Sequence, residues 1–119
     1  MDQDPIFSLK DALARLDDDR ETFQMMVELF LEQGPRDLAE AHTAVDAQNA
    51  PALARSSHRL RGTILQFCAP AALQACKDLE ETAKAGTVTN AGVLYVTLER
   101  ELLRLLDALR QVRDEGMAA

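Results

Sequence analysis

The sequence predicts an all-α protein: an up-down antiparallel four-helix bundle with a short additional helix at its N-terminus. Apolar residues recur at spacings of three and four over several long segments, which is the period of an amphipathic helix. The chain has no Trp, one Tyr and four Phe, so its core must consist mainly of Leu, Ala, Val and Met, and the β-branched and aromatic runs typical of strands are scarce. The links between the helical segments are short, which makes consecutive helices antiparallel neighbours.

A chain of 119 residues is long enough for one core and therefore for one domain. We expect an N-terminal tail at residues 1–7, whose Ile6 and Phe7 can dock, the bundle at residues 8–115, and a C-terminal tail at residues 116–119. The longest apolar run is far shorter than the roughly 20 residues that span a bilayer. The first residues lack the basic and apolar regions of a signal peptide. We therefore expect a cytoplasmic protein that does not enter a membrane.

The first two helices are separated by an acidic triplet. Ser8 is the expected N-cap of a short helix from Leu9 to about Leu16, and Asp17-Asp18-Asp19 then forms a turn that caps the next helix. The second helix is expected from about Arg20 to Ala47. The pair Gly34-Pro35 either divides it or kinks it, and the unbroken apolar spacing favours a kinked or nearly continuous helix. Its apolar positions are Phe23, Met26, Val27, Phe30, Gly34, Leu38, Ala41 and Val45.

Prolines mark the start of the next two helices. Pro51 suits the first turn of the third helix, which is expected to end near Phe67 to Ala69, and Pro70 suits the first turn of the fourth. Gly86 is the expected residue just after the fourth helix.

The last helix has the most regular pattern in the chain. Its apolar repeat extends over about six turns to Glu115, and Thr89 or Asn90 is the candidate N-cap. Such a repeat marks either a coiled coil between chains or the last member of a bundle. With amphipathic partners in the same chain, we favour the bundle and expect a monomer. The repeat consists of Ala91, Leu94, Leu98, Leu102, Leu105, Leu109 and Val112.

The two cysteines, Cys68 and Cys76, are eight residues apart on apolar helix faces and form no C-x-x-C pair. We interpret them as core thiols rather than a disulfide. His42 lies among polar residues with no partner in the sequence, and we interpret it as an ordinary surface histidine.

Charge is distributed unevenly along the chain. The net charge of −7 disfavours binding to nucleic acid. Between Asp46 and Asp78, however, no residue is acidic. This segment contains a basic island, which predicts an acidic partner surface that approaches under electrostatic steering. The island consists of Arg55, Arg59, Arg61 and Lys77.

His58 stands near the middle of the third helix. At about 100° per residue, Leu53, Leu60 and Ile64 fall in one sector that faces the core, and His58 lies roughly opposite it. Arginines flank it at i−3 and i+3, and Gly62 follows at i+4. Because glycine inside a helix costs about 0.5–1 kcal/mol relative to alanine, we interpret Gly62 as clearance for another molecule's backbone.

An exposed imidazole beside fixed positive charge has the parts needed to carry a phosphoryl group: a nitrogen nucleophile and guanidinium donors for phosphate oxygens. No Cys, Asp, Glu or second His has the spacing to join His58 in a metal site, so no metal is expected on this chain. From the residues alone, a phosphate role and an ordinary surface histidine both remain open.

The run His58-x-Leu60-Arg61-Gly62-Thr63, followed by Phe67, Ala69, Cys76 and Leu79-Glu80, resembles the histidine phosphotransfer (HPt) domain family. The family pattern is approximately H-x-L-K-G-S, then an apolar residue, G-A, a cysteine and L-E. The likeness extends over most of the chain. It implies the same four-helix bundle, with the phosphoacceptor near the middle of the third helix.

The resemblance implies a phosphorelay intermediate. His58 would take a phosphoryl group on Nε2 from the phospho-aspartate of a receiver domain and pass it to the aspartate of another. Arg61 lies where the family has lysine and would support the phosphate, Gly62 would permit close approach, and Thr63 would bond back to the helix backbone. The partners would be response-regulator receivers or a hybrid histidine kinase. No cofactor is expected here, because the receiver brings its own divalent metal.

Three further positions are our additions from the helical wheel: Arg55 and Arg59 as steering charges and Leu65 as an exposed apolar docking contact. The chain also departs from the family pattern. Arg61 is a planar fork rather than a point charge, Cys68 stands where glycine is usual near the helix end, and Leu65-Gln66 replaces small residues.

Other functions remain open from the sequence. A histidine kinase's dimerisation and phosphoacceptor helix pair usually has an acidic residue directly after its histidine and an ATP-binding domain, whereas here Arg59 follows His58. A non-catalytic adaptor or inhibitor that docks on a receiver or kinase without relaying phosphate is compatible with every residue. An independent hydrolase lacks a second catalytic group beside His58. We expect a phosphocarrier without kinase activity of its own.

Overall fold

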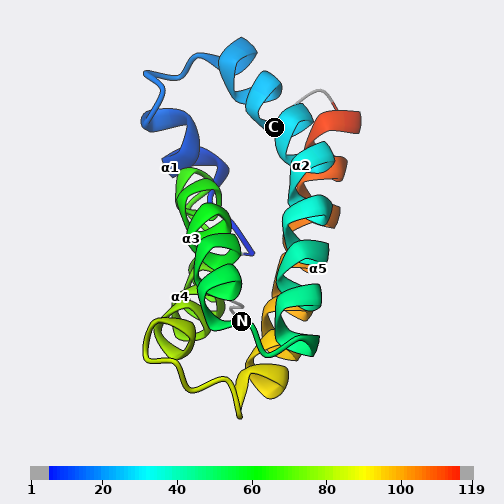
Figure 1. Cartoon of the computed structure of the whole chain (residues 1–119). Helices are drawn as coiled ribbons and strands as arrows, with labels where there is room; N and C mark the ends of the chain where they lie inside the picture. The colour runs from blue at the N-terminus through cyan, green and yellow to red at the C-terminus, as the bar shows by residue number, and fades with distance from the viewer. Residues whose placement is uncertain (1–5, 116–119) are drawn as a thin grey trace, which may run out of the picture.

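The computed structural model describes residues 6–115, and the predicted tail residues 1–5 and 116–119 lie outside this range. Within it, every regular element is a helix (Figure 1). Helices α2 to α5 form an antiparallel bundle, and α1 covers one end of it. The predicted fold class is therefore confirmed. The helices are α1 (Leu9–Ala14), α2 (Arg20–Asp46), α3 (Ala50–Gln66), α4 (Pro70–Lys84) and α5 (Ala91–Asp114).

Each of the four long helices packs against two of the others, so that together they enclose one core. Helix α3 packs between α2 and α4, and α5 packs against the other side of the same two helices. At one end, the Ser8 backbone N–H donates to the Cys68 carbonyl over 3.1 Å and ties the start of α1 to the end of α3. Ile6 and Phe7 pack against the core, as expected. This arrangement leaves one long face of α3 open to solvent.

Three phenylalanines, two from α2 and one directly after α3, form the aromatic part of the core. The Phe67 ring stacks on Phe30 with a centroid separation of 5.3 Å and meets Phe23 edge to face at 5.8 Å. All three are buried. Because Phe67 follows α3 directly, these contacts hold α3 against α2 near the site described below.

Helix α2 runs unbroken through Pro35, which decides between the two sequence interpretations. Pro35 is exposed, so the backbone carbonyl that its ring leaves without a partner can bond to water. Packing explains why residue 34 is a glycine, because a Cβ there would lie 3.0 Å from Phe30 Cε1. The glycine therefore leaves room for the aromatic cluster.

The predicted caps at the first two helices are confirmed. Ser8 Oγ accepts from the Asp11 N–H, and Asp19 Oδ1 accepts from the Thr22 N–H, each over 3.1 Å. At α5 the N-cap is Asn90, one of the two candidates that the sequence offers, but its side chain does not cap the helix. This is because its φ and ψ of −97° and 7° are not the extended backbone of an N-cap.

Helix α1 ends at Ala14, two residues before the predicted Leu16. The chain turns here because Asp17 and Asp18 adopt left-handed backbone angles, with φ of 54° and 62°. Asp tolerates this conformation better than most residues.

The two cysteines are free thiols, but only Cys76 lies in the core. Cys68 is half-buried and follows the end of α3 with a φ of 55°, so it does not lie on a helix face as expected. His42, which we interpreted as having no partner, stacks on Tyr95 at 5.1 Å, and its Nε2 lies 3.6 Å from Asp46 Oδ2. The Asp46 contact is an i, i+4 pair that the sequence spacing could have predicted, whereas the Tyr95 contact depends on how α2 and α5 pack together.

Candidate functional site

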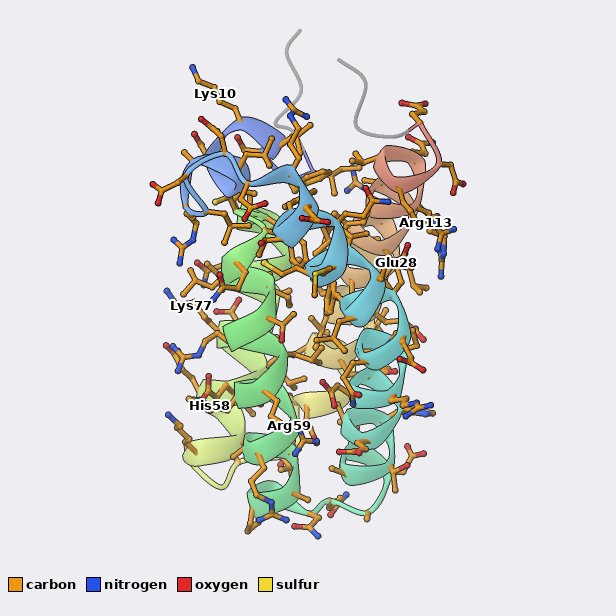
Figure 2. All side chains as sticks on the ribbon, turned by 90° about the horizontal axis from the view of Figure 1, so that it is seen from above. Lys10, Glu28, His58, Arg59, Lys77 and Arg113 are labelled. Atoms are coloured by element: carbon orange, nitrogen blue, oxygen red, sulfur yellow. The ribbon has the colours of Figure 1, made fainter. Side chains whose placement is uncertain are left out.

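His58 projects from the middle of α3 on the side away from the core. Leu60 and Ile64, on the opposite side of the helix, have no exposed surface, whereas the His58 side chain is 62% exposed. Figure 2 shows His58 and Arg59 on different flanks of α3, with Arg59 on the flank that faces α2. The helical spacing in the sequence predicts this exposure.

The backbone beneath His58 is held by buried side chains. Ser57 Oγ donates to the Leu53 carbonyl over 2.6 Å, and Cys76 Sγ donates to the Ser57 carbonyl over 3.0 Å. Burial, aided by the Glu80 charge, raises the pKa of the Cys76 thiol to about 12. The thiol therefore stays protonated and acts as a donor that fixes α3 to α4.

Glu80 of α4 is the buried carboxylate of the site, with only 4% of its side chain exposed. Its Oε2 lies 2.9 Å from His58 Nδ1 and 3.2 Å from Lys84 Nζ, and its Oε1 lies 2.7 Å from Arg61 Nε. Burial raises the pKa of this carboxyl group, but the bonds from His58 and Lys84 and the Arg61 charge outweigh burial and bring the pKa below its usual value. Glu80 is therefore a carboxylate at neutral pH.

The Glu80 carboxylate determines which imidazole nitrogen is available for chemistry. A carboxylate only accepts hydrogen bonds, so the 2.9 Å contact requires His58 Nδ1 to carry a proton. Arg61 Nη2 also lies 3.1 Å from Nδ1. Because Arg61 can only donate, it forms no hydrogen bond with the protonated Nδ1, and both groups are held close by the same acceptor, Glu80. In the neutral ring the lone pair then belongs to Nε2, which is the nucleophilic atom.

Two of the predicted arginines are engaged with carboxylates. Arg61 is turned toward Glu80. Arg59 Nε lies 3.5 Å from Oδ1 of the buried Asp37, and its Nη2 bonds to Glu40, both on α2. Acidic side chains from neighbouring helices therefore offset much of the positive charge of the basic island, although the segment that contains the island has no acidic residue.

The remaining predicted residues surround His58 on α3. Gly62 is exposed, and a Cβ built on it would meet no atom within 4 Å. Thr63 Oγ1 donates to the Arg59 carbonyl over 3.3 Å, so its hydroxyl bonds back to the helix, as the resemblance implies. Leu65 is 45% exposed, and Arg55 is exposed one turn before His58.

Two hollows border α3 near the histidine, and His58 itself lines the second. The first, of about 410 Å³, lies between α2 and α3 and is largely apolar. The second, of about 470 Å³, lies between α3 and α4. The first, called the α2–α3 groove below, is lined by Met26, Leu29, Phe30, Gln33, Gly62, Thr63, Gln66 and Phe67. The second, called the α3–α4 hollow, is lined by Ala54, Arg55, His58, Arg59, Glu80 and Lys84.

Among residues 6–115, no three His, Cys, Asp or Glu side chains come together in a way that could hold a metal ion. In the same part of the chain, no helix is both long enough and apolar enough to cross a membrane.

Comparison with known proteins agrees with this geometry. The family model described as Hpt domain matches residues 25–114, which is most of the chain. The chain belongs to the Hpt domain family. Histidine-containing phosphotransfer protein B from Pseudomonas aeruginosa has a similar structure, with a TM-score of 0.86 and 23% sequence identity over 95% of this chain and 98% of that one. No curated protein sequence matches the chain significantly.

The Hpt domain is a histidine phosphotransfer intermediate in phosphorelay signalling. Proteins of this family are phosphocarriers that work with receiver domains and histidine kinases. The predicted family and the predicted histidine phosphotransfer function are therefore confirmed.

Two residues of the Hpt site were not singled out from the sequence. Glu80 appeared only as the last letter of the family pattern, and Lys84 did not appear at all. Both lie on α4, more than twenty residues from His58, and the bundle brings them to it. The available signal was the i, i+4 spacing of Glu80 and Lys84, which predicts a pair on one helix face but not what that face packs against.

Proposed function

We propose that His58 accepts a phosphoryl group from the phospho-aspartate of one receiver domain and passes it to an aspartate of another. The observation that carries the proposal is the bond between His58 Nδ1 and the buried Glu80 carboxylate. It orients an exposed ring and leaves the Nε2 lone pair free to attack phosphorus.

In the first transfer, the Nε2 lone pair forms the N–P bond while the P–O bond to the donor aspartate breaks. That aspartate leaves as a carboxylate with the electron pair. The ring becomes an imidazolium whose Nδ1 proton stays in the bond to Glu80, which stabilises the new positive charge. In the second transfer, the acceptor aspartate attacks phosphorus and the N–P electrons return to Nε2.

The phosphoryl oxygens carry negative charge throughout the transfer, and this charge needs positive partners from both proteins. Arg61 supplies one from this chain, since its guanidinium already lies beside the ring. The receiver would supply a divalent metal in its own acidic pocket. This protein would act as a phosphocarrier without kinase activity or a cofactor of its own.

The receiver would dock over the open face of α3. Gly62 lets its backbone approach, and Leu65 and the adjacent α2–α3 groove offer apolar contact. Arg55 would steer the acidic receiver. Arg59 would contribute less, because Asp37 and Glu40 already pair with it.

The proposal is tested with a phosphorylated receiver and two matched variants. The chain has two histidines, so His58→Gln and His42→Gln each leave one. We expect acid-labile, base-stable label on wild type and His42→Gln and none on His58→Gln. Incubation with ATP and Mg²⁺ alone should label none of the three.

Two results would contradict the proposal. Label that persists on His58→Gln would move the phosphoacceptor elsewhere. Receivers from the same cell that bind wild type tightly without transferring label would identify a docking adaptor instead.

A further inference from the structure

A second cation, Lys84, lies on the flank of His58 that faces α4. Its Nζ is 3.2 Å from Glu80 Oε2, the oxygen that also contacts His58 Nδ1. The Lys84 side chain is 62% exposed and stands on a flexible four-carbon stem, so its ammonium group can change partners at the surface. Lys84, Arg55 and His58 line the same α3–α4 hollow.

The cluster around Glu80 carries more positive charge than this carboxylate neutralises. Arg61 and Lys84 both contact Glu80, and Arg55 lines the α3–α4 hollow beside them. With a neutral imidazole, three cations therefore face one buried anion. A phosphoryl group carries close to two negative charges at neutral pH, which matches the excess. The unphosphorylated site therefore already has the excess positive charge that a phosphoryl dianion would neutralise.

We propose that Lys84 is a phosphate ligand of the phosphorylated protein. When Nε2 carries the phosphoryl group, Lys84 Nζ moves from Glu80 Oε2 to the phosphoryl oxygens, while Arg61 keeps its contact with Glu80 Oε1. In the unphosphorylated protein, Glu80 holds this ammonium beside the ring. The inference rests on the proposed role of His58 as phosphoacceptor.

A cation on the phosphoryl oxygens has a definite effect on the lifetime of the phosphohistidine. Hydrolysis forms a bond from water oxygen to phosphorus and breaks the N–P bond, whose electrons return to Nε2. In a loose transition state, electron density moves from the phosphoryl oxygens toward phosphorus as the ring leaves. Lys84 holds that density on the oxygens, so it stabilises the ground state more than the transition state. Its presence should therefore slow the loss of phosphate.

The test uses potassium phosphoramidate, a small-molecule donor that needs no receiver: the N–P bond to His58 forms as ammonia leaves. Wild type, Lys84→Gln, Lys84→Arg and Lys77→Gln are phosphorylated, the reagent is removed, and phosphohistidine decay is followed by ³¹P NMR. Lys77→Gln is the matched control, since it removes the same charge from α4 about two turns earlier.

We expect Lys84→Gln to shorten the phosphohistidine lifetime roughly threefold, as for a partly exposed ion pair. Lys84→Arg should restore most of the lifetime, and Lys77→Gln should behave as wild type. A merely structural role in α4 would not change this decay rate. An unchanged lifetime in Lys84→Gln would overturn the inference.

The same experiment separates this inference from the proposed function. A working relay with a lifetime that does not depend on Lys84 contradicts the inference alone. A Lys84-dependent lifetime at His58 without exchange with any cognate receiver contradicts the relay alone. If neither phosphoramidate nor a phosphorylated receiver labels His58, both are wrong.

Discussion

At the scale of single residues, helix stability favours alanine at position 62, whereas the proposed docking of a partner favours the glycine that is there. Gly62 lies in the exposed middle of α3, and a Cβ there would meet no atom of this chain within 4 Å. Packing within the protein therefore gives no reason for glycine. The proposed approach of a receiver backbone gives one.

We predict that Gly62→Ala raises the free energy of unfolding by about 0.5–1 kcal/mol through helix propensity. At the same time it should lower kcat/KM for phosphotransfer by about tenfold, because the methyl group meets the docked receiver. Urea unfolding and transfer kinetics measure the two effects. Gly92→Ala is the control, because Gly92 is an exposed glycine of α5 with equally open surroundings. A Gly62→Ala protein with full transfer activity would remove the docking argument.

Glu80 makes stability depend on pH in a defined direction. Its pKa in the folded protein is below the ordinary value of about 4.5. Its charge therefore stabilises the fold above the unfolded-state pKa, and this contribution is lost as the pH falls through the folded-state pKa. We predict that Glu80→Gln is less stable than wild type at pH 7 and that the difference shrinks below pH about 4.

Urea unfolding at a series of pH values measures this difference. Asp107→Asn is the comparison, because Asp107 is an exposed carboxylate paired with Arg110. Its difference from wild type should stay small throughout. A Glu80→Gln difference that does not change with pH would show that the buried carboxylate is not stabilised by its cationic partners.

At the scale of elements, the end of α3 carries backbone strain. Cys68 has a φ of 55°, in the left-handed region where side chains are unfavourable and where glycine is common after a helix. Gln48 after α2 has a similar φ of 52°. The departure from the family glycine, visible in the sequence at position 68, therefore has a physical cost.

We predict that Cys68→Gly raises the free energy of unfolding by about 1 kcal/mol, since it removes the left-handed penalty. Cys68→Ser keeps the Cβ and should show no such gain. Thermal and urea unfolding of both variants measure the effect. A destabilised Cys68→Gly would mean that the half-buried thiol contributes more through packing than the backbone strain costs.

At the scale of the whole molecule, the bundle assembles an apolar groove that no single helix contains. Met26 and Leu29 come from α2, and Gly62 and Gln66 come from α3. Leu29 is 64% exposed and lines this groove, so its side chain is available for apolar contact with a partner. The α2–α3 groove thus extends the surface around His58 beyond the residues predicted for docking.

We predict that Leu29→Asp raises the Kd for a cognate receiver about tenfold through lost apolar contact and an added negative charge facing an acidic partner. Val93→Asp is the control: Val93 is 73% exposed on α5, which packs against α2 and α4 rather than beside α3. Calorimetric titration measures both. Equal affinity of the two variants would place the docking face elsewhere.

Local patterns in the sequence were sufficient for most of the fold. These patterns are the spacing of apolar residues, the caps at Ser8 and Asp19 and the first-turn prolines. Each depends on residues that are close together in the chain, so each can be recognised in the sequence. The same spacing placed His58 on the exposed side of α3. Its proposed role as phosphoacceptor came from the motif, since an exposed imidazole alone has several uses.

Only the tertiary structure decided which charges meet. Glu80 and Lys84 reach His58, and Asp37 reaches Arg59, across helix interfaces. Sequence spacing reports the faces of each helix separately and does not report which faces pack together. The basic island was therefore visible in the sequence, whereas the buried carboxylate that orients the imidazole depends on how α3 and α4 pack against each other.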